Sequence, residues 1–244
     1  MTAPAPSPCH RPVDLARVNR TLAALDARDR IAWALECLPG GHVLSSSFGV
    51  QAALMLHLVG EVAPGLPVIF IDTGYHFAET YRFVDKLSER LEVNLKVYRP
   101  RLSAAWQEAR HGRRWEQGRD GLERYNRDSK VEPMQRALGE LRAGTWLSGL
   151  RRSQSATRAQ LDFVTRQWRC IKVHPVADWS DRDVHAYLTR HALPYHPLRE
   201  RGYVSIGDWH TTRSLSEVDS EDQARFFGLM RECGLHRQTG RHSR

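Results

Sequence analysis

Apolar residues occur along the chain first with helical spacing and then in short runs. Between residues 15 and 38 they recur every three or four positions, which predicts one or two amphipathic helices. After Pro39-Gly40-Gly41, short apolar runs alternate with further helical patterns. We expect strands at 42–44, 67–71, 93–98, 145–150 and 171–176, and helices at about 50–59, 77–91, 104–110 and 180–191.

This alternation predicts an α/β fold with a mainly parallel, twisted sheet and helices on both of its faces. We expect a disordered, Pro- and Ala-rich segment at 1–14 and a single α/β nucleotide-binding domain at 15–198. Residues 199–244 are basic, contain several glycines and show no clear strand, so we expect a partly mobile C-terminal segment. Ligands of such sheets bind beyond the carboxyl ends of the strands, where candidate chemistry is sought first.

Composition narrows the class of protein. Hydrophobic residues make up 41% of the 244 residues and charged residues 26%, which is ordinary globular usage. No run approaches the roughly 18 apolar residues of a membrane span, and the N-terminal residues lack a secretory signal, so we expect a cytoplasmic protein. Lys and Arg number 36 against 28 Asp and Glu, and the resulting charge of +8 favours an anionic partner.

The first candidate site is Ser45-Ser46-Ser47-Phe48-Gly49, between a predicted strand and a predicted helix. Backbone N–H groups and the helix dipole favour an anion at a helix N-terminus, and the hydroxyls and Gly49 add donors and allow close approach. The GxxxxGK[ST] pattern of a Walker A loop is absent. Simple capping by serine explains the same residues about as well.

The second candidate, Asp72-Thr73-Gly74, ends the next predicted strand and is suited to holding a ribose or a base edge. An ordinary turn between strand and helix is the simpler reading of these three residues. A third set supplies cations and a hydroxyl that are suited to clamping an anion, although such residues are commonly only solvated. This set comprises Lys130, Arg151, Arg152, Arg158, Thr211 and Arg213.

Cys233 is the candidate nucleophile. It lies in Glu232-Cys233-Gly234-Leu235-His236, where a neighbouring glycine and nearby cations favour an exposed thiol of lowered pKa. The other cysteines are Cys9, Cys37 and Cys170, and the chain has no CxxC or CC pair. The spacing argues against a cysteine-ligated zinc ribbon or iron–sulfur cluster, and no metal site is predicted. An inert thiol near the chain end remains the alternative for Cys233.

Together these segments resemble the thioredoxin-dependent phosphoadenosine phosphosulfate (PAPS) reductases. The resemblance covers about residues 30 to 236, and its most specific parts are SSSFG and ECGLH. The matching motifs, in chain order, are SSSFGVQ, IDTGYHFAETYRF, NLKVYR, AAWQEAR, KVEP, GLRRSQS, YHPL and FFGLMRECGLH. The resemblance implies an adenine-nucleotide α-hydrolase type of sheet, with 45–49 as a modified PP-loop that binds phosphate.

The resemblance also implies a reaction. The Cys233 thiolate would attack the sulfonyl sulfur of PAPS, leaving an enzyme S-sulfocysteine, and reduced thioredoxin or glutaredoxin would release sulfite. His236 would join the substrate-binding residues. Two electrons are needed, and a lone reactive cysteine cannot supply them, so an external dithiol is expected unless Cys37 or Cys170 acts as a resolving partner. The family further implies a homodimer.

Three alternatives stay open. Relatives that reduce adenosine phosphosulfate (APS) usually carry a CC…CxxC set for a [4Fe-4S] cluster, which this chain lacks. PAPS is therefore the expected substrate, with a cluster-free APS reductase as the alternative. A PP-loop ATP pyrophosphatase or nucleotidyl transferase would use 45–49 but leave Cys233 without a role. A basic nucleic-acid-binding protein has only net charge in its favour, so no nucleic-acid or membrane partner is expected.

Overall fold

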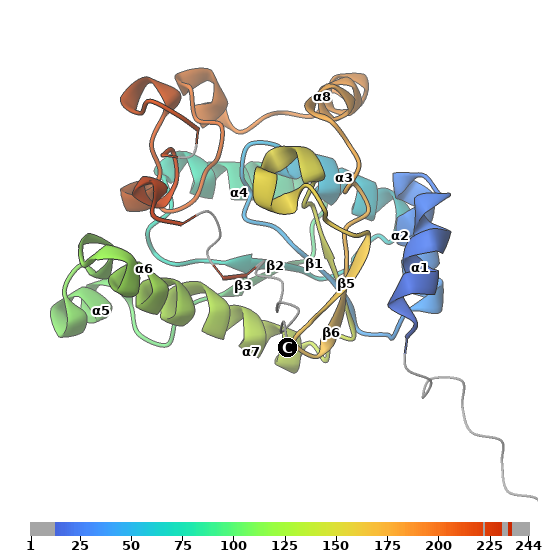
Figure 1. Ribbon diagram of the computed structural model, residues 1–244, viewed down its shortest axis with the longest axis horizontal. Helices are drawn as coiled ribbons and strands as arrows, with labels where there is room; N and C mark the ends of the chain where they lie inside the picture. Colours follow the sequence, from blue (N-terminus) through green and yellow to red (C-terminus); the bar gives the residue numbers. More distant parts are fainter. Residues whose placement is uncertain (1–12, 222, 231–233, 236–244) are drawn as a thin grey trace, which may run out of the picture.

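The computed structural model describes residues 13–221, 223–230 and 234–235, and its ribbon is shown in Figure 1. Two helices precede the sheet, α1 (Leu15–Ala23) and α2 (Ala27–Cys37). The strands are β1 (His42–Ser45), β2 (Val68–Ile71), β3 (Leu95–Tyr98), β4 (Thr145–Ser148), β5 (Val164–Gln167) and β6 (Cys170–Val173). The remaining α-helices are α3 (Ala52–Val62), α4 (Ala78–Arg90), α5 (Ala104–His111), α6 (Gly118–Asn126), α7 (Glu132–Glu140) and α8 (Asp181–Arg190).

The strands form one sheet in the order β3-β2-β1-β4-β6-β5. All neighbouring strands are parallel except β5, which pairs antiparallel with β6. From β1 the chain adds β2 and β3 on one side and then returns to add β4, β6 and β5 on the other side. The strand order therefore reverses between β1 and β4, and ligands of such sheets bind at this switch point. The predicted fold class is confirmed.

Each face of the sheet has its own apolar core. On one face, strand residues such as Leu44, Phe70 and Leu147 pack with side chains from α1, α2, α3, α4 and α8. On the other face, Val43, Ile69 and Trp146 pack with α7. Helices α6 and α7 accordingly lie on the opposite side of the sheet from α3 and α4 (Figure 1).

The sequence analysis assigned no element to two regions that the structure fills. Residues 118–140 form α6, a π-helical turn (Arg127–Val131) and α7, which run on as one helical segment. The two α-helices are only nine residues each, too short for a clear periodic signal. Strand β5, Val-Thr-Arg-Gln, is a half-exposed edge strand whose polar residues hide it from a search for apolar runs.

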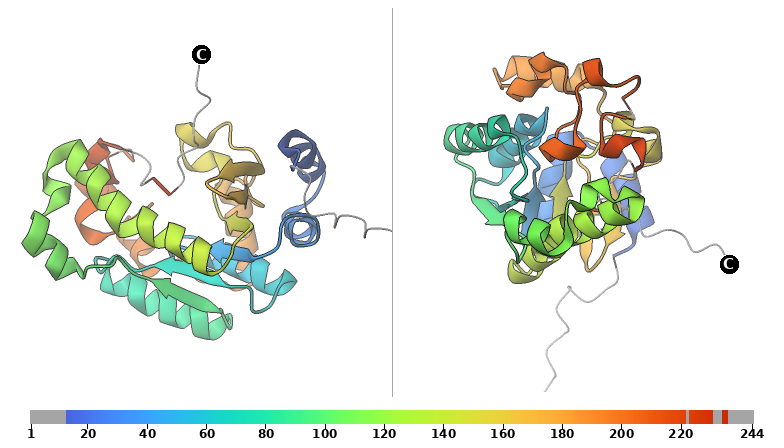
Figure 2. Two further views of the ribbon diagram at one scale, coloured as in Figure 1. Left: turned by 90° about the horizontal axis from the view of Figure 1, so that it is seen from below. Right: turned by 90° about the vertical axis from the view of Figure 1, so that its left-hand side faces the viewer.

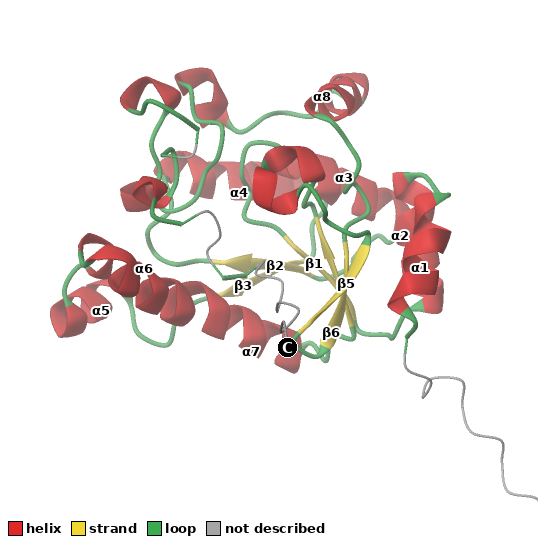
Figure 3. Cartoon of the chain, viewed as in Figure 1, coloured by secondary structure: helices red, strands yellow, loops and turns green. Residues whose placement is uncertain are grey.

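The described part of the C-terminal segment packs against α6. Phe226 and Met230 are buried with Tyr75, Trp115 and Tyr125 in a third apolar cluster. Figure 2 shows this segment beside α6 in two views, and Figure 3 shows that it consists of loops and short helical turns. Among the described residues no helix is long and apolar enough to cross a membrane.

Candidate functional site

A cavity of about 330 Å³ lies at the carboxyl ends of the central strands. Ser45, Ile71 and Ser148, the last residues of β1, β2 and β4, all line it. The predicted site residues that line the cavity are Ser45, Ser46, Ser47, Gly49, Thr73, Lys130, Arg151 and Arg158. Those outside the lining are Phe48, Asp72, Gly74, Arg152, Thr211 and Arg213. Cys233 and His236 lie outside the described residues.

The loop after β1 lies in front of the N-terminus of α3. Its shape is held by side-chain hydrogen bonds: Ser46 Oγ accepts from the N–H of Phe48 (3.1 Å), and Ser45 Oγ accepts from Trp146 Nε1 (2.7 Å). Within the described part of the chain, the N–H groups of Ser47 and Gly49 donate to no protein acceptor. Two available donors beside the positive end of an α-helix favour a bound anion.

Phe48 differs from the sequence expectation of a substrate-binding residue. Its side chain is 0% exposed and packs edge-on against Phe70, with 5.4 Å between ring centroids. The backbone of Phe48 has a positive φ of 49°, which turns the ring into the core while the rest of the loop stays at the cavity. Phe48 therefore anchors the loop, and its ring lies in the core instead of lining the cavity.

A second wall of the cavity, besides the Ser45–Gly49 loop, is built around Asp208, which connects four segments of the chain. It is 0% exposed, and its carboxylate pairs with Lys130 Nζ (2.5 Å) and accepts from Thr73 Oγ1 (2.5 Å) and the Tyr125 hydroxyl (3.0 Å). Lys130 belongs to the π-helical turn, a distortion that is frequent at functional sites. The network holds the Lys130 ammonium at the cavity although that side chain is itself nearly buried.

Burial and charge shift the pKa values of this wall in consistent directions. Burial raises the pKa of Asp208, but the Lys130 ammonium and its hydrogen bonds outweigh burial and hold that pKa well below its usual range. Burial and the neighbouring Asp208 carboxylate raise the pKa of Tyr125. Burial lowers the pKa of His210, which stacks on Trp115, to about 4. The wall therefore carries one ion pair and neutral rings at pH 7.

The predicted arginines have different surroundings. Arg151 is 3% exposed, and its guanidinium donates to Gln51 Oε1 (2.6 Å), Asp181 Oδ1 (2.8 Å) and the Trp179 carbonyl (3.2 Å). These contacts commit much of its donor capacity to the protein. Arg158 lines the cavity and donates to Gln154. Arg152 instead donates to the Leu161 carbonyl and lies over the Phe163 ring, away from the cavity.

Arg225 lines the cavity and was missed in the sequence analysis. Its Nη1 donates to Ser205 Oγ (3.1 Å), and its guanidinium lies against Gly207, where an added Cβ would come within 2.3 Å of Nη2. The absence of a side chain at Gly207 thus lets the cation reach the cavity. No sequence signal marks Arg225, because its place depends on how residues 199–230 pack.

Asp72, Gly74, Thr211 and Arg213 have structural partners instead of a place at the cavity. Asp72 accepts from the Gly74 N–H (3.0 Å), the Tyr81 hydroxyl (2.7 Å) and Arg99 Nε (2.8 Å). Burial raises its pKa, but these bonds lower it overall. Thr211 is buried and its N–H donates to the Asp208 carbonyl, while Arg213 caps backbone carbonyls and lies over Phe227. The prediction that they bind substrate directly gains no geometric support.

The cysteines that the structure describes are poorly suited to nucleophilic work. Cys170 is buried on β6 and donates to the Ala143 carbonyl, and burial raises its pKa. Cys37 is exposed at the end of α2, and burial and Glu36 raise its pKa. Among the described residues no group of three His, Cys, Asp or Glu side chains is placed to hold a metal ion. Leu235, two residues after Cys233, lines the cavity.

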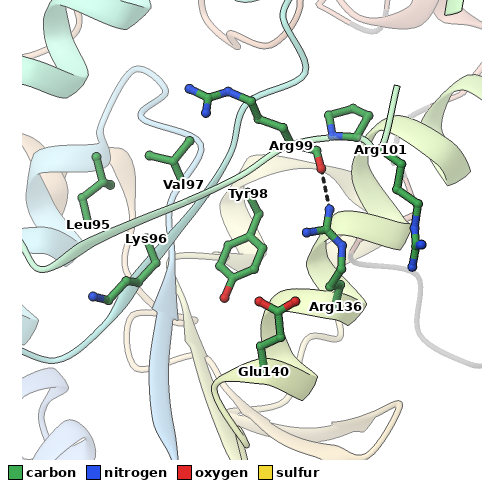
Figure 4. A pocket seen from close by; sticks show the side chains of 9 residues that line it. Leu95, Lys96, Val97, Tyr98, Arg99, Arg101, Arg136 and Glu140 are labelled. Carbon is green, nitrogen blue, oxygen red and sulfur yellow. Dashed lines mark hydrogen bonds between the residues drawn. The ribbon is translucent and has the colours of Figure 1, made fainter. Parts of the chain in front are cut away.

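A second hollow runs along the edge strand β3, and Figure 4 shows it from close by. Lys96, Arg99, Arg101 and Arg136 surround it, and Arg136 donates to the Arg99 carbonyl (2.5 Å). Burial and a hydrogen bond to Glu140 raise the pKa of Tyr98. This groove is open and lies away from the central strand ends and the Ser45–Gly49 loop, so we assign the site to the smaller cavity.

Residues 41–214 match the family model of the phosphoadenosine phosphosulfate reductase domain. A phosphoadenosine 5′-phosphosulfate reductase of Alkalilimnicola ehrlichii is 60% identical over 95% of this chain and 94% of its own. The enzyme of the same name from Shewanella oneidensis is 58% identical over 91% of both chains. The chain belongs to the phosphoadenosine phosphosulfate reductase family. It is accordingly an oxidoreductase of sulfate assimilation.

Solved structures agree with this membership. The phosphate complex of PAPS reductase from Candida auris superposes with a TM-score of 0.72 at 33% identity, covering 87% of this chain and all of its own. FMN adenylyltransferase from Candida glabrata, at 14% identity and a TM-score of 0.55, covers 80% of this chain and 69% of its own. The second likeness shows a shared fold alone, as expected for an adenine-nucleotide α-hydrolase type of sheet. The reductase family is therefore confirmed on both sequence and fold.

Proposed function

We propose that the protein reduces PAPS to sulfite and adenosine 3′,5′-bisphosphate, with Cys233 as the nucleophile. The observation that carries this proposal is the position of Leu235. It lines the same cavity as Ser45 and Gly49, and Cys233 is only two residues away in the chain. The Ser45–Gly49 loop and Leu235 thus line one cavity, and this supports a role for Cys233 at the same site.

The electrostatics of the cavity support a highly anionic substrate. The N–H groups of Ser47 and Gly49 are available donors, and Lys130, Arg158 and Arg225 bring cationic groups to the lining. Asp208 is the carboxylate of the lining, and it is paired with Lys130. PAPS carries a phosphosulfate and a 3′-phosphate, and charge-assisted hydrogen bonds to such groups are among the stronger polar contacts in proteins. We assign the phosphosulfate to the Ser45–Gly49 loop.

The chemistry proceeds in two displacements. The Cys233 thiolate attacks the sulfonyl sulfur, an S–S bond forms, and the S–O bond to phosphate breaks with its electron pair leaving on adenosine 3′,5′-bisphosphate. A thiolate of reduced thioredoxin or glutaredoxin then attacks Cys233 Sγ, and sulfite leaves with the electron pair of the broken S–S bond. The second thiol of the donor resolves the mixed disulfide. The dithiol is oxidised by two electrons, and the enzyme needs no bound cofactor or cluster.

Sulfite formation with PAPS or APS, in the presence of a thioredoxin-regenerating system, tests this proposal. We expect PAPS to be the better substrate and Cys233→Ser to abolish sulfite formation. Cys37→Ser, which removes an exposed thiol on α2, is the matched control and should keep normal turnover. A preference for APS would make the protein a cluster-free APS reductase. Full turnover by Cys233→Ser would instead favour a PP-loop ATP pyrophosphatase or nucleotidyl transferase.

We also propose that the protein works as a cytoplasmic homodimer, as the family resemblance implies. Sedimentation velocity at micromolar concentration should give twice the mass of the 28.0 kDa chain. A single species of monomer mass at that concentration would contradict the dimer without touching the proposed chemistry.

A further inference from the structure

A lysine is buried within the sheet, on the strand next to the antiparallel edge strand. Lys172 lies on β6, between β4 and β5, and is 1% exposed. A buried ammonium is costly unless strong polar contacts replace its water. Its Nζ donates to Gln167 Oε1 (2.7 Å) and lies 3.8 Å from the centroid of a Trp146 ring, an energetically favourable cation–π contact. The same Nζ also donates to the backbone carbonyl of Leu235 (3.2 Å).

Gln167 makes a second contact with that carbonyl. Its Nε2 donates to the Leu235 carbonyl (2.7 Å) while its Oε1 accepts from Lys172. The ammonium fixes the orientation of the amide, because a flipped amide would place an NH₂ group against a cation. One backbone oxygen near the chain end therefore receives two donors, both from nearly buried side chains. We call Gln167 and Lys172 together the carbonyl dock.

Strand pairing builds the dock. Lys172 is opposite Trp146 in the β4–β6 pair, and Gln167 is opposite Cys170 in the β5–β6 pair. Because neighbouring residues on paired strands share a face, these side chains lie on the face that α7 covers. The Leu235 side chain packs against the same apolar cluster, which includes Trp146. Leu235 is 63 residues from Lys172 and 68 from Gln167, so the contact is tertiary and not a local turn.

The dock is continuous with the cavity. The Trp146 ring that contacts the Lys172 ammonium donates its indole N–H to Ser45 Oγ, and Ser45 is the first residue of the phosphate loop. On the other side, Gly234 has a φ of 91°, and an added Cβ would lie 3.2 Å from Val131 Cγ2 of the π-helical turn that carries Lys130. Gly234 and Leu235 therefore lie between the dock and that turn, at the rim of the nucleotide cavity.

We propose that the carbonyl dock is a positioning device for the reaction: by holding Leu235 at the cavity, Gln167 and Lys172 keep the Cys233 segment within reach of the bound nucleotide. The covalent chain places a Cα two residues away within about 7 Å, whatever its conformation. The positioning role rests on the proposed function. The contact of Gln167 and Lys172 with the Leu235 carbonyl does not rest on it, since that contact exists without substrate.

Gln167→Glu tests the dock with little disturbance of the sheet. The carboxylate keeps the volume of glutamine and still accepts from Lys172, but it loses the N–H that donates to Leu235 and presents a negative oxygen to that carbonyl. Arg169→Ala, an exposed residue of the same hairpin, is the matched control. Lys172→Met removes the other donor to the Leu235 carbonyl. It serves as a second variant in case Gln167→Glu rearranges the side chains around it.

Two measurements read the result. Hydrogen exchange followed by mass spectrometry reports on peptides that contain Gly234 and Leu235, without any substrate. We expect roughly tenfold faster exchange there in Gln167→Glu, the change that losing one hydrogen bond produces, and unchanged exchange in Arg169→Ala. Single-turnover sulfonation of Cys233 by PAPS should slow by roughly tenfold or more, while the affinity for adenosine 3′,5′-bisphosphate stays within about twofold.

Unchanged exchange of the chain end in both dock variants would overturn the dock. Faster exchange with an unchanged rate of sulfonation would overturn its positioning role, and so would a loss of nucleotide affinity as large as the loss of rate. If the wild-type protein exchanged as expected but no PAPS-dependent sulfonation of Cys233 occurred, the contact would stand and the proposed function would fall.

Discussion

The two walls of the nucleotide cavity are built in different ways. The Ser45–Gly49 wall comes from five consecutive residues. The bond between Ser46 and Phe48 spans two residues, and Trp146 adds one tertiary bond to Ser45. The opposite wall brings together Thr73, Lys130 and Asp208, which are distant in the chain: the bond between Thr73 and Asp208 spans 135 positions. The first wall is a local structure that the helix α3 completes. The second exists only when several parts of the fold have assembled.

This difference has an energetic side. The bonds within the local wall are neutral and half-buried, and a typical hydrogen bond contributes only about 1 kcal/mol net. The assembled wall contains a buried ion pair, and removing one partner of such a pair leaves a charge without compensation. Substitutions in the two walls should therefore have unequal effects on the free energy of unfolding.

Asp208→Asn should give the largest effect. It leaves the Lys130 ammonium buried without a counter-ion, and we expect the free energy of unfolding in urea to fall by about 3–5 kcal/mol. The double variant with Lys130→Met should recover much of this loss, because it removes the orphaned charge. A single variant as stable as the wild type would show that the assembled wall does not depend on the pair.

Acid should weaken the assembled wall. The pKa of His210 is about 4 in the folded protein, because of burial, against about 6.5 in the unfolded chain. Its contribution to stability is therefore fully present above pH 6.5 and is lost progressively as pH falls toward 4, because the unfolded state then binds the extra proton. At pH 5 the loss is about 2 kcal/mol from this group.

His210→Phe checks that assignment. Neither ring nitrogen of His210 has a hydrogen-bond partner among the described residues, so the phenyl ring loses no such bond in the aromatic cluster. Denaturant unfolding between pH 7 and pH 4.5 should show a shallower loss of stability in the variant. Identical slopes for the variant and the wild type would mean that the pKa of His210 is the same in the folded and unfolded states.

Gly207→Ala should act on ligand binding more than on folding. The new Cβ would clash with the flexible end of Arg225, which would move away from the cavity at little cost to the core. We expect the affinity for adenosine 3′,5′-bisphosphate, measured by calorimetry, to fall roughly tenfold. Gly60→Ala, on α3 with no packing partner within 4 Å of the new Cβ beyond its own helix backbone, should leave affinity unchanged. Equal affinity in both variants would remove Arg225 from the site.

Ser46→Ala should have the smallest effect. It removes one half-buried acceptor for the Phe48 N–H, and we expect a loss of about 0.5–1.5 kcal/mol in the free energy of unfolding. A loss as large as that of Asp208→Asn would show that the loop is not a local structure and would erase the contrast between the walls.

The same contrast decides what could be predicted from the sequence. The loop at Ser45–Gly49 was recognisable because a strand, small polar residues and a helix follow one another in the chain. The capping box of Ser180 and Asp183 at the start of α8 is of the same local kind. Lys130 and Arg158 line the cavity, and their role as anion clamps stays a prediction.

Features that depend on tertiary packing were not recognised. Asp208 had no assigned role, although its carboxylate is the centre of the assembled wall, because nothing in its neighbourhood shows that Thr73 and Lys130 will reach it. Arg225 and the dock residues Gln167 and Lys172 were missed for the same reason. Asp72 was expected at the ligand, yet Arg99 and Tyr81 take up its oxygens. A pattern along the chain identifies residue chemistry but not which partners use that chemistry.

The account rests on the transfer of a sulfonyl group to Cys233, and intact-protein mass spectrometry tests it most directly. The reduced protein is mixed with PAPS in the absence of any thiol, and the mass and the modified peptide are determined. We predict the gain of a single SO₃ group on the peptide that contains Cys233, reversed by reduced thioredoxin. An unmodified protein under conditions where sulfite forms once thioredoxin is added, or a group carried by Cys37 or Cys170, would contradict it.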